Sequence, residues 1–202
     1  MTDDESWSRL PVLDGRLIRL EPLALEHAPG YFAAAGTGEV AEEVFRWMSY
    51  YPPKTLDEAI GQVTEGIESP IRRPFVQLDA QTGEVAGTTS FYEISPATRS
   101  LAIGHTWLGQ RWWRTGHNTE SKLLLLTHAF DALGAARIVW HTDIYNERSQ
   151  TAIARLGATR EGVLRKHRIR RDGSWRDTVQ YSMTDDDWPG VRERLTARLA
   201  AG

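Results

Sequence analysis

The spacing of hydrophobic residues changes along the chain, and each change marks a new predicted element. In the middle of the chain, short apolar stretches alternate with turn residues, which is the pattern of antiparallel strands. The expected strands cover 75–78, 85–94 and 101–108, with Gln81-Thr82-Gly83 and Pro96 at the turns between them. The middle of the chain is therefore predicted to be a three-stranded meander.

The N-terminal third is predicted to contain one strand and two helices. Residues 17–20 have the pattern of a strand that stops at Pro22, and a short helix is expected over 28–35. A second helix begins after Thr55, because Thr55 and Glu58 have the spacing of a capping box. Its buried face is expected to contain Leu56, Ile60, Val63 and Ile67.

Two stretches of this third carry no regular pattern. Residues 1–11 are expected to be a loose lead-in. Residues 36–54 are expected to be irregular, with one arginine among aromatic residues: Phe45, Arg46, Trp47, Tyr50 and Tyr51. Such a segment can shape a binding site, and it can equally be a lid packed on the core.

From residue 118 onwards the apolar spacing indicates helices and a buried strand. Helices are expected over 118–133 and 146–156, ended by Gly134 and Gly157. Between them, residues 138–140 form an unbroken apolar run, which is typical of a parallel strand covered on both faces.

The last third is predicted to be a hairpin followed by a helix. Its strands cover 159–169 and 175–183 and are joined at Asp172-Gly173, a strong turn dipeptide. The apolar face of the final helix contains Trp188, Val191, Leu195 and Leu199. The order of elements predicts one α/β domain over 1–202, with a mixed sheet and one strand–helix–strand crossover at its centre.

Composition and charge narrow the class of protein. Of the 202 residues, 41% are hydrophobic and 25% are charged, so the chain can bury a sizeable core. The net charge of −3 argues against a general polyanion binder. The chain contains no cysteine, which excludes disulfides and a cysteine nucleophile and agrees with a reducing compartment. No secretory signal and no membrane-spanning apolar stretch is recognisable, so a cytoplasmic protein is expected.

The junction at 113–118 is the first candidate site. A strand leads here into a helix, and the first amides of a helix have no intrahelical acceptor. Together with the helix dipole these amides can hold a phosphate, and Arg114 adds a cation. The alternative is that Gly116 is only a turn residue before an Asn118 N-cap. The sequences G-x-x-x-x-G-K-[ST] and G-x-G-x-x-G do not occur, so nucleotide triphosphatases and dinucleotide-binding folds lack their loops.

Ser149 is the second candidate. On the helix at 146–156 it shares a face with Ala152, Ile153 and Leu156, so its hydroxyl is expected to point inward near the helix start. Such a hydroxyl either bonds back to the preceding turn or donates a proton to a ligand in a cleft.

Taken together, the two candidate sites resemble those of the GCN5-related N-acetyltransferases (GNAT). The resemblance lies in the order of elements, in Gly116-His117-Asn118-Thr119-Glu120, and in Asn146-x-x-Ser149 followed by Leu156-Gly157-Ala158. It extends from residue 13 to residue 189 and points to the Rim-type group, which acetylates N-terminal amines of ribosomal proteins. The resemblance implies a mixed, mostly antiparallel seven-stranded sheet with a central splay, helices on both faces and acetyl-CoA in the splay.

The resemblance also implies which residues bind coenzyme A. In this family the loop amides hold the diphosphate, the preceding strand end pairs with the pantetheine arm, and the next helix contacts that arm and the sulfur. The corresponding residues are Trp107, Leu108, Trp113, Arg114, Thr115, Gly116, His117, Asn118, Thr119, Asn146 and Ser149. Two keyed positions depart from the family pattern, because Trp113 replaces Gln or Arg and Asn118 replaces a small residue.

The implied reaction is direct attack of a neutral amine on the thioester, with Ser149 protonating the departing thiolate. An α-amine, with a pKa of about 8, suits such a site better than a lysine, with a pKa of about 10.4. Relatives often carry a glutamate base at the position of Ala102, and His105 on the same strand is taken as its substitute. The acceptor is expected to contact four residues of the irregular segment: Phe45, Arg46, Trp47 and Tyr50.

Several alternatives stay open. The donor can be succinyl-CoA or another acyl-CoA, and the acceptor can be a protein N-terminus or a small-molecule amine. Residues 160–176 carry seven Lys or Arg against two acidic residues, so a non-catalytic protein of this fold could contact RNA or the ribosome through them. A solvated ribbon is the simpler interpretation. No metal site, membrane contact or specific nucleic acid is expected, and a homodimer agrees with the family.

Overall fold

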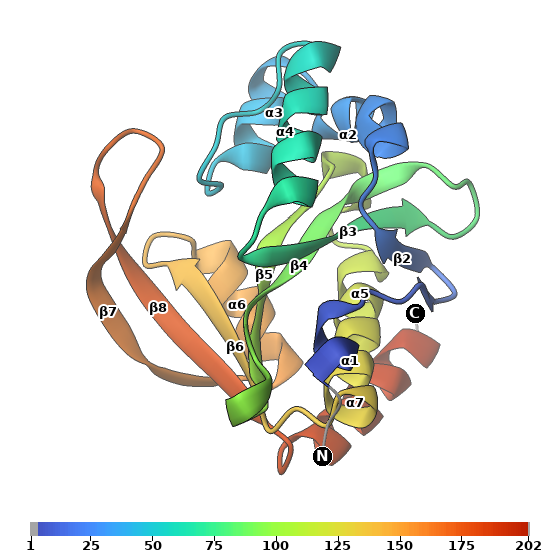
Figure 1. Cartoon of the computed structure of the whole chain (residues 1–202), viewed down its shortest axis with the longest axis vertical. Coiled ribbons are helices and arrows are strands. Elements are labelled where there is room, and N and C mark those ends of the chain that lie inside the picture. The colour runs from blue at the N-terminus through green and yellow to red at the C-terminus, as the bar shows by residue number, and fades with distance from the viewer. Residues whose placement is uncertain (1–3, 202) are drawn as a thin grey trace.

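One mixed sheet forms the frame of the molecule (Figure 1). The computed structural model describes residues 4–201 and contains eight strands in the order β1-β2-β3-β4-β5-β6-β8-β7. The strands are β1 (Leu13–Asp14), β2 (Ile18–Pro22), β3 (Arg72–Asp79), β4 (Val85–Ser95), β5 (Ser100–Leu108), β6 (Arg137–Asp143), β7 (Thr159–Ile169) and β8 (Trp175–Thr184). All neighbouring strands are antiparallel except β5 and β6, which are parallel.

Helices cover both faces of this sheet (Figure 1). The helices are α1 (Asp4–Ser8), α2 (Ala28–Ala35), α3 (Gly38–Phe45), α4 (Leu56–Glu68), α5 (His117–Thr127), α6 (Glu147–Leu156) and α7 (Trp188–Ala200). A π-helical turn, His128–Ala132, continues α5. Side chains of α2, α3 and α4 form one core with Val76 and Trp107, and side chains of α5 and α7 form a second core on the opposite face. None of the helices within residues 4–201 is long and apolar enough to cross a membrane.

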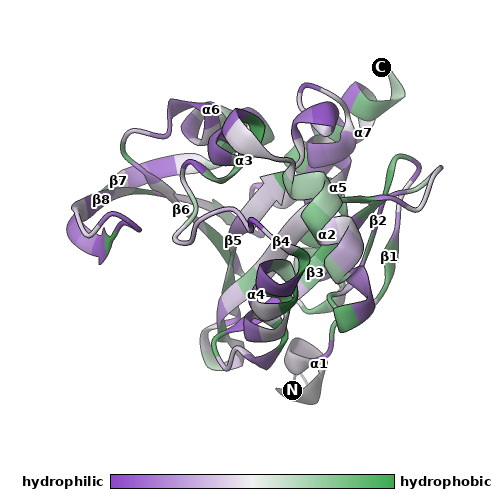
Figure 2. Ribbon diagram, turned by 90° about the horizontal axis from the view of Figure 1, so that it is seen from above, coloured by the Kyte–Doolittle hydropathy of each residue, from purple (hydrophilic) through white to green (hydrophobic). Residues whose placement is uncertain are grey.

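The predicted meander, the parallel central strand and the final hairpin and helix are confirmed. The sheet has eight strands rather than seven, because Leu13 and Asp14 pair with Leu20 and Arg19. The β7–β8 hairpin is hydrophilic and extends beyond the body of the molecule (Figure 2). The mixed sheet with helices on both faces is therefore as predicted, with one short edge strand added.

Two segments predicted to be irregular contain helices. Within the expected lead-in, α1 places Trp7 in the core beneath α5 and α7, where the side chain is only 3% exposed. Residues 1–3 lie outside the described part of the chain. Within the 36–54 segment, α3 ends in the fully buried Phe45. Both helices are too short to be stable by themselves, and the packing of one buried aromatic side chain in the core stabilises each of them. The spacing of apolar residues in the sequence does not reveal this contact.

The buried face of α4 also differs from the prediction. Thr55 caps this helix as expected, because its hydroxyl accepts the Glu58 N–H at 3.2 Å. The buried side is formed by small or β-branched residues, namely Ala59, Val63 and Gly66. Three predicted core residues, Leu56, Ile60 and Ile67, are 40–41% exposed. A Cβ at Gly66 would lie 3.0 Å from Arg72 Nη2, so close packing on β3 selects small side chains here.

A β-bulge in β5 separates the two halves of the sheet. Opposite Thr89 of β4, β5 has two residues, His105 and Thr106, and His105 has a left-handed backbone (φ 48°). β5 and β6 pair only at the start of β5, from Ser100 to Ala102. Beyond this point the two parallel strands are not paired, which is the predicted central splay.

Glu120, near the start of α5, fixes the N-terminal strand to this helix. Its buried carboxylate accepts three backbone N–H groups, from Arg16 at 3.1 Å, Leu17 at 2.6 Å and Ile18 at 2.9 Å. Gly15 makes the approach possible, because a Cβ there would lie 2.6 Å from Glu120 Oε2. The path of the backbone into β2 is therefore fixed by the buried side chain of Glu120.

We expect Glu120→Ala to lower the free energy of unfolding by about 3 kcal/mol or more, because it leaves three N–H groups without their acceptor. Urea unfolding followed by circular dichroism measures the change. Glu193→Ala, at an exposed position of α7, is the matched control and should change stability by less than about 0.5 kcal/mol. Equal stability of the two variants would contradict the assigned role of Glu120.

Candidate functional site

Two buried side chains hold the bulge in β5 in place. Gln77 of β3 donates from Nε2 to the carbonyls of Thr88 at 3.0 Å and Trp107 at 3.2 Å. Its Oε1 accepts the hydroxyl of Ser121 of α5 at 2.6 Å. The strand geometry on both sides of the bulge is thus connected to the helix that follows β5.

Lys122 of α5 is the second of these side chains. Its Nζ donates to the hydroxyl oxygens of Thr106 at 3.0 Å and Thr89 at 3.3 Å, and these two hydroxyls lie 2.7 Å apart. The lysine is 5% exposed, and no ion pair of its ammonium occurs within residues 4–201. Burial lowers its pKa to about 7. A titratable group therefore lies directly beneath the bulge.

His105, the predicted base, lies at the bulge itself. Its ring packs edge-on against Tyr92 with centroids 5.3 Å apart. Burial lowers the pKa of His105 to about 4, and the nearby cations Arg72, Arg168 and Arg176 act in the same direction. The imidazole is consequently neutral at physiological pH.

A second histidine, His141 of β6, faces His105 across the splay through Tyr92. The Tyr92 hydroxyl lies 3.0 Å from His141 Nδ1, and His141 Nε2 lies 3.1 Å from Gln180 Oε1. Since the amide oxygen of Gln180 only accepts, Nε2 carries the proton and Nδ1 accepts from the tyrosine. Burial lowers the pKa of His141, so this ring is also neutral.

The loop between β5 and α5 has the backbone of an anion site. Arg114 has a left-handed backbone (φ 59°), and the N-cap residue of α5 is Gly116, which has no capping side chain. The first amide of α5, that of His117, donates to Thr115 Oγ1 at 3.3 Å. Alternation of left- and right-handed residues turns successive N–H groups toward one concavity. The structure places Gly116, not Asn118, at the N-cap, so Asn118 lies inside the first turn of the helix.

Gly116 has a packing reason of its own. A Cβ there would lie 2.5 Å from Leu17 Cδ1, so a larger residue would force the Leu17 side chain to move. His117 is anchored on both ring nitrogens, by Thr115 Oγ1 at 2.9 Å and by Asp79 Oδ2 at 2.9 Å. Burial opposes ionisation of Asp79, but hydrogen bonds from His117 and the following turn keep its pKa below the ordinary value. These side chains support the loop, and Thr115 also accepts the His117 N–H at 3.3 Å.

The predicted strand-end contacts are partly occupied by the protein. The Leu108 carbonyl accepts the indole N–H of Trp113 at 2.7 Å, and the Trp107 carbonyl accepts from Gln77. The Trp107 ring lies 4.9 Å from both Tyr31 and Phe45 in the core.

Helix α6 brings Asn146 and Ser149 to the opposite side of the splay. Asn146 caps this helix, because its Oδ1 accepts the Ser149 N–H at 3.0 Å. Ser149 is half-buried, in agreement with its predicted inward face. Its neighbour Arg148 stacks over Trp113 with the guanidinium carbon 4.1 Å from the ring centroid. The loop after β5 and the start of α6 are therefore in direct contact.

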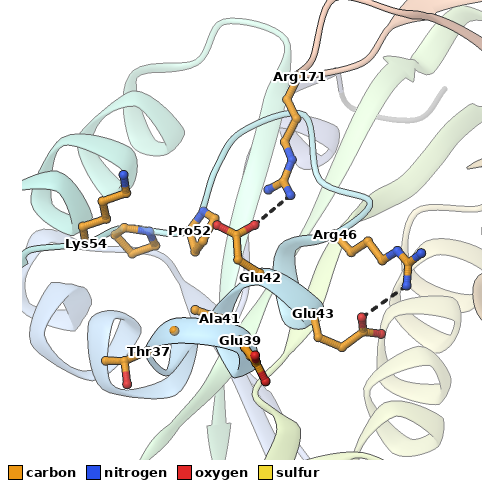
Figure 3. Close-up of a pocket in the computed structure, with 11 residues that line it drawn as sticks. Thr37, Glu39, Ala41, Glu42, Glu43, Arg46, Pro52, Lys54 and Arg171 are labelled. Carbon is orange, nitrogen blue, oxygen red and sulfur yellow. Dashed lines mark hydrogen bonds and ion pairs between the residues drawn. The ribbon is translucent and has the colours of Figure 1, made fainter.

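The predicted acceptor residues do not form one surface. Phe45 is fully buried and belongs to the core, and the half-buried Tyr50 packs against it. Trp47 is also half-buried and lies beneath the Arg46 guanidinium. Arg46 faces a hollow between α3 and the tip of the β7–β8 hairpin (Figure 3). Arg171 of that tip pairs with Glu42 at 3.0 Å, which holds the hairpin against α3.

Sequence reasoning missed Lys122, Tyr92 and His141. Lys122 lies in a helix whose apolar pattern gives no sign of a buried cation, and the two others meet only through strand pairing. No group of three or more His, Asp or Glu side chains within residues 4–201 is arranged to hold a metal ion.

Comparisons with known proteins agree with this geometry. Residues 17–159 match the profile of the acetyltransferase (GNAT) domain. Over 150 residues the chain is 26% identical to the ribosomal protein uS5-alanine N-acetyltransferase of Escherichia coli (strain K12), covering 73% of this chain and 76% of that protein. A GCN5-related N-acetyltransferase from Brucella melitensis superposes with a TM-score of 0.90 and 32% identity, over 94% of this chain and 85% of that one. RimJ of Mycobacterium smegmatis in complex with CoA-disulfide has the same fold, with a TM-score of 0.76, 21% identity and 96% of each chain covered.

The buried lysine should make stability depend on pH. Folding lowers the Lys122 pKa from 10.5 to about 7, so the folded state is penalised fully below pH 7 and not at all above pH 10.5. The free energy of unfolding should therefore rise with pH between these limits, by up to about 5 kcal/mol from this group. Lys122→Met should remove that rise.

The measurement is urea unfolding of both proteins at several pH values from 7 to 10. Lys54→Met, at an exposed lysine, is the control and should keep the dependence of the parent. A stability difference between Lys122→Met and the parent that is constant over this range would disprove the assignment.

Proposed function

The chain belongs to the acetyltransferase (GNAT) family, and from this premise we propose that it transfers acetyl from acetyl-CoA to a primary amine by direct attack. It is an N-acetyltransferase with distant homology to the Rim-type ribosomal-protein enzymes. The proposed acceptor is a protein N-terminus or a small-molecule α-amine. The observation that carries this proposal is the splay at the bulge of β5, which has an open backbone loop on one side and Ser149 on the other.

The loop residues are proposed to bind the coenzyme A diphosphate. The amides that open α5, with Arg114 and Thr115, offer hydrogen-bond donors and positive charge for an anion. Binding of the diphosphate depends on the loop backbone. The side chains of Trp113 and Asn118, which differ from the family pattern, are therefore expected to affect it little. Trp113 fixes the loop to the strand end, and Asn146 has its amide nitrogen free of the capping bond made by Oδ1.

The neutral state of the histidines supports an α-amine as acceptor. Transfer of a proton from an ammonium with a pKa of about 8 to an imidazole with a pKa of about 4 costs about 5 kcal/mol. His105 is therefore better suited to accept a hydrogen bond from an amine that binds neutral than to remove its proton beforehand. At pH 7.5 the neutral form costs an α-amine under about 1 kcal/mol but a lysine about 4 kcal/mol.

Ser149 is proposed as the proton donor to the thiolate. It lies in the first turn of α6, on the inward side, and its own N–H is held by Asn146.

The basic hairpin supports a rival RNA-binding role less well, because Arg168, Arg170 and Arg171 pair with carboxylates of the same chain at 2.7–3.0 Å. Calorimetric titration with acetyl-CoA and succinyl-CoA separates the two donors.

The pH dependence of catalysis should follow the acceptor amine and not His105. With a lysine-free peptide as acceptor, kcat/KM should rise with pH and level off above about pH 8, the pKa of an α-amine. His105, with a pKa of about 4, stays neutral throughout pH 6–9 and adds no inflection. His105→Gln should lower kcat/KM by about tenfold at every pH, the effect of one hydrogen bond. An inflection near pH 6.5 that this variant abolishes would refute the hydrogen-bond role.

Substitution of Ser149 should affect chemistry and not binding. We expect Ser149→Ala to lower kcat by about 100-fold, which is typical for loss of a general acid, with an unchanged dissociation constant for acetyl-CoA. Thr151→Ala, on the exposed side of the same helix, is the control and should leave both quantities as they are. Thiol release and calorimetry give the two readings, and an unchanged kcat in Ser149→Ala would eliminate the proton-donor assignment.

A further inference from the structure

Two arginines of the β7–β8 hairpin face the histidines of the splay. Arg168 and Arg176 are direct partners in the strand register. Between Leu164 and Arg168, β7 has a bulge in which Lys166 has a left-handed backbone (φ 50°), and its N–H is held by Asp177 Oδ1 at 2.7 Å. Like charges directly opposite each other on a sheet are destabilising unless another charge balances them.

The carboxylates near these arginines do not balance both. Glu93 pairs with Arg168 at 3.0 Å. The two oxygens of Asp143 accept from Arg170 at 2.7 and 3.1 Å, and Oδ1 also accepts the Tyr145 N–H at 3.0 Å. Asp143 is therefore engaged mainly by a bidentate pair with Arg170.

Arg176 is the cation that is left over. Its Nε lies 3.9 Å from Asp143 Oδ2, beyond hydrogen-bond distance, and this buried nitrogen has no hydrogen-bond partner within residues 4–201. The side chain is only 17% exposed. Burial lowers the pKa of Arg176 despite the attraction of Asp143, so the structure disfavours this charge as it stands. A buried donor of this kind is costly unless a partner arrives.

The positive field of these arginines reaches the reaction site. Burial lowers the pKa of each of His105, His141 and His167, and for all three Arg168 and Arg176 add to the effect. The ring of His167, next to Arg168 on β7, packs against His141 with centroids 5.4 Å apart. His141 and His105 both pack against Tyr92, so this part of the hairpin is connected by ring contacts to His105, the group proposed to receive the amine.

We infer that Arg176, assisted by Arg168, binds a carboxylate of the acceptor, so that the preferred acceptor is an amine bearing a carboxylate close to its amino group. This inference rests on the proposed function and specifies its substrate class. The Arg176 guanidinium, whose buried Nε has no hydrogen-bond partner within residues 4–201, supplies one charge and a planar pair of donors. This matches a carboxylate monoanion better than a phosphate dianion. The carboxylate can be an acidic side chain next to the N-terminal residue or the terminal carboxylate of a short peptide or amino acid.

The test compares acceptors that differ in one charge. One pair is Ala-Asp against Ala-Asn, both with amidated C-termini, and the second is Ala-Ala with a free against an amidated C-terminus. The kcat/KM values are corrected for the fraction of neutral amine. We expect the charged member of at least one pair to be favoured by about tenfold or more, the effect of a charged hydrogen bond. The pair that shows the preference identifies the source of the carboxylate.

Variants distinguish recognition from folding. Arg176→Gln should raise KM for the favoured acceptor by about tenfold and leave its uncharged partner unchanged, and Arg176→Lys should restore part of the preference. Arg168→Gln, at a more exposed site, should reduce the preference without loss of the fold. Arg165→Gln, at an exposed arginine of the same strand, should behave as the parent protein. Equal kcat/KM within both pairs, or a loss in Arg176→Gln that is the same for charged and uncharged acceptors, would overturn the inference.

Calorimetry with amidated Ala-Asp and the protein saturated with CoA separates the two proposals. If no amine is acetylated but this peptide binds in an Arg176-dependent manner, the carboxylate site stands and the proposed acceptor falls. If amines are acetylated without regard to charge, the proposed function stands and the carboxylate site falls.

Discussion

The bulge at His105 and Thr106 is the constraint on which the rest of the site depends. β5 pairs with β6 only as far as Ala102, and the bulge lies just beyond, where the two parallel strands are no longer paired. A bulge of this kind exposes backbone groups in the interior, and the protein secures it with buried polar side chains. Gln77 bonds to both flanking strands, and Lys122 bonds to Thr89 and Thr106. Gln77 also bonds to Ser121 of α5, and Lys122 belongs to α5 itself. The helix whose first turn is the proposed diphosphate site therefore also holds the bulge, where the acyl group is proposed to react.

The charged and titratable groups around the bulge differ on its two sides. Below the bulge lies a lysine whose charge is disfavoured by burial, and above it lie neutral histidines near arginines. This environment favours a neutral nucleophile and negative charge that develops during the reaction. Ala102 occupies the position at which relatives often carry a glutamate. Its uncharged side chain agrees with a neutral acceptor amine, because a carboxylate there would stabilise the ammonium form of the acceptor.

Most of the fold could be predicted from the sequence, because strands and long helices follow the periodicity of their buried faces. The exceptions have physical reasons. α1 and α3 are too short to show a period, and each depends on a distant contact of Trp7 or Phe45. On α4 the large residues were expected inside, but close packing required Gly66 and Ala59 there. The loop before α5 and Ser149 were recognisable as motifs. Arg176 and Lys122 were not, because burial and contacts between separate elements, which the sequence pattern of one strand or helix does not show, distinguish them from other basic residues.

Trp7 extends the buried core to residues outside the segment that matches the family. The family match covers residues 17–159, yet Trp7 and Trp188, both outside that range, are buried in the same core. A shortened chain cut to the limits of the match would lose aromatic packing from both ends together with the turn at Gly15. The core that Trp7 and Trp188 share therefore extends beyond the segment delimited by the family match.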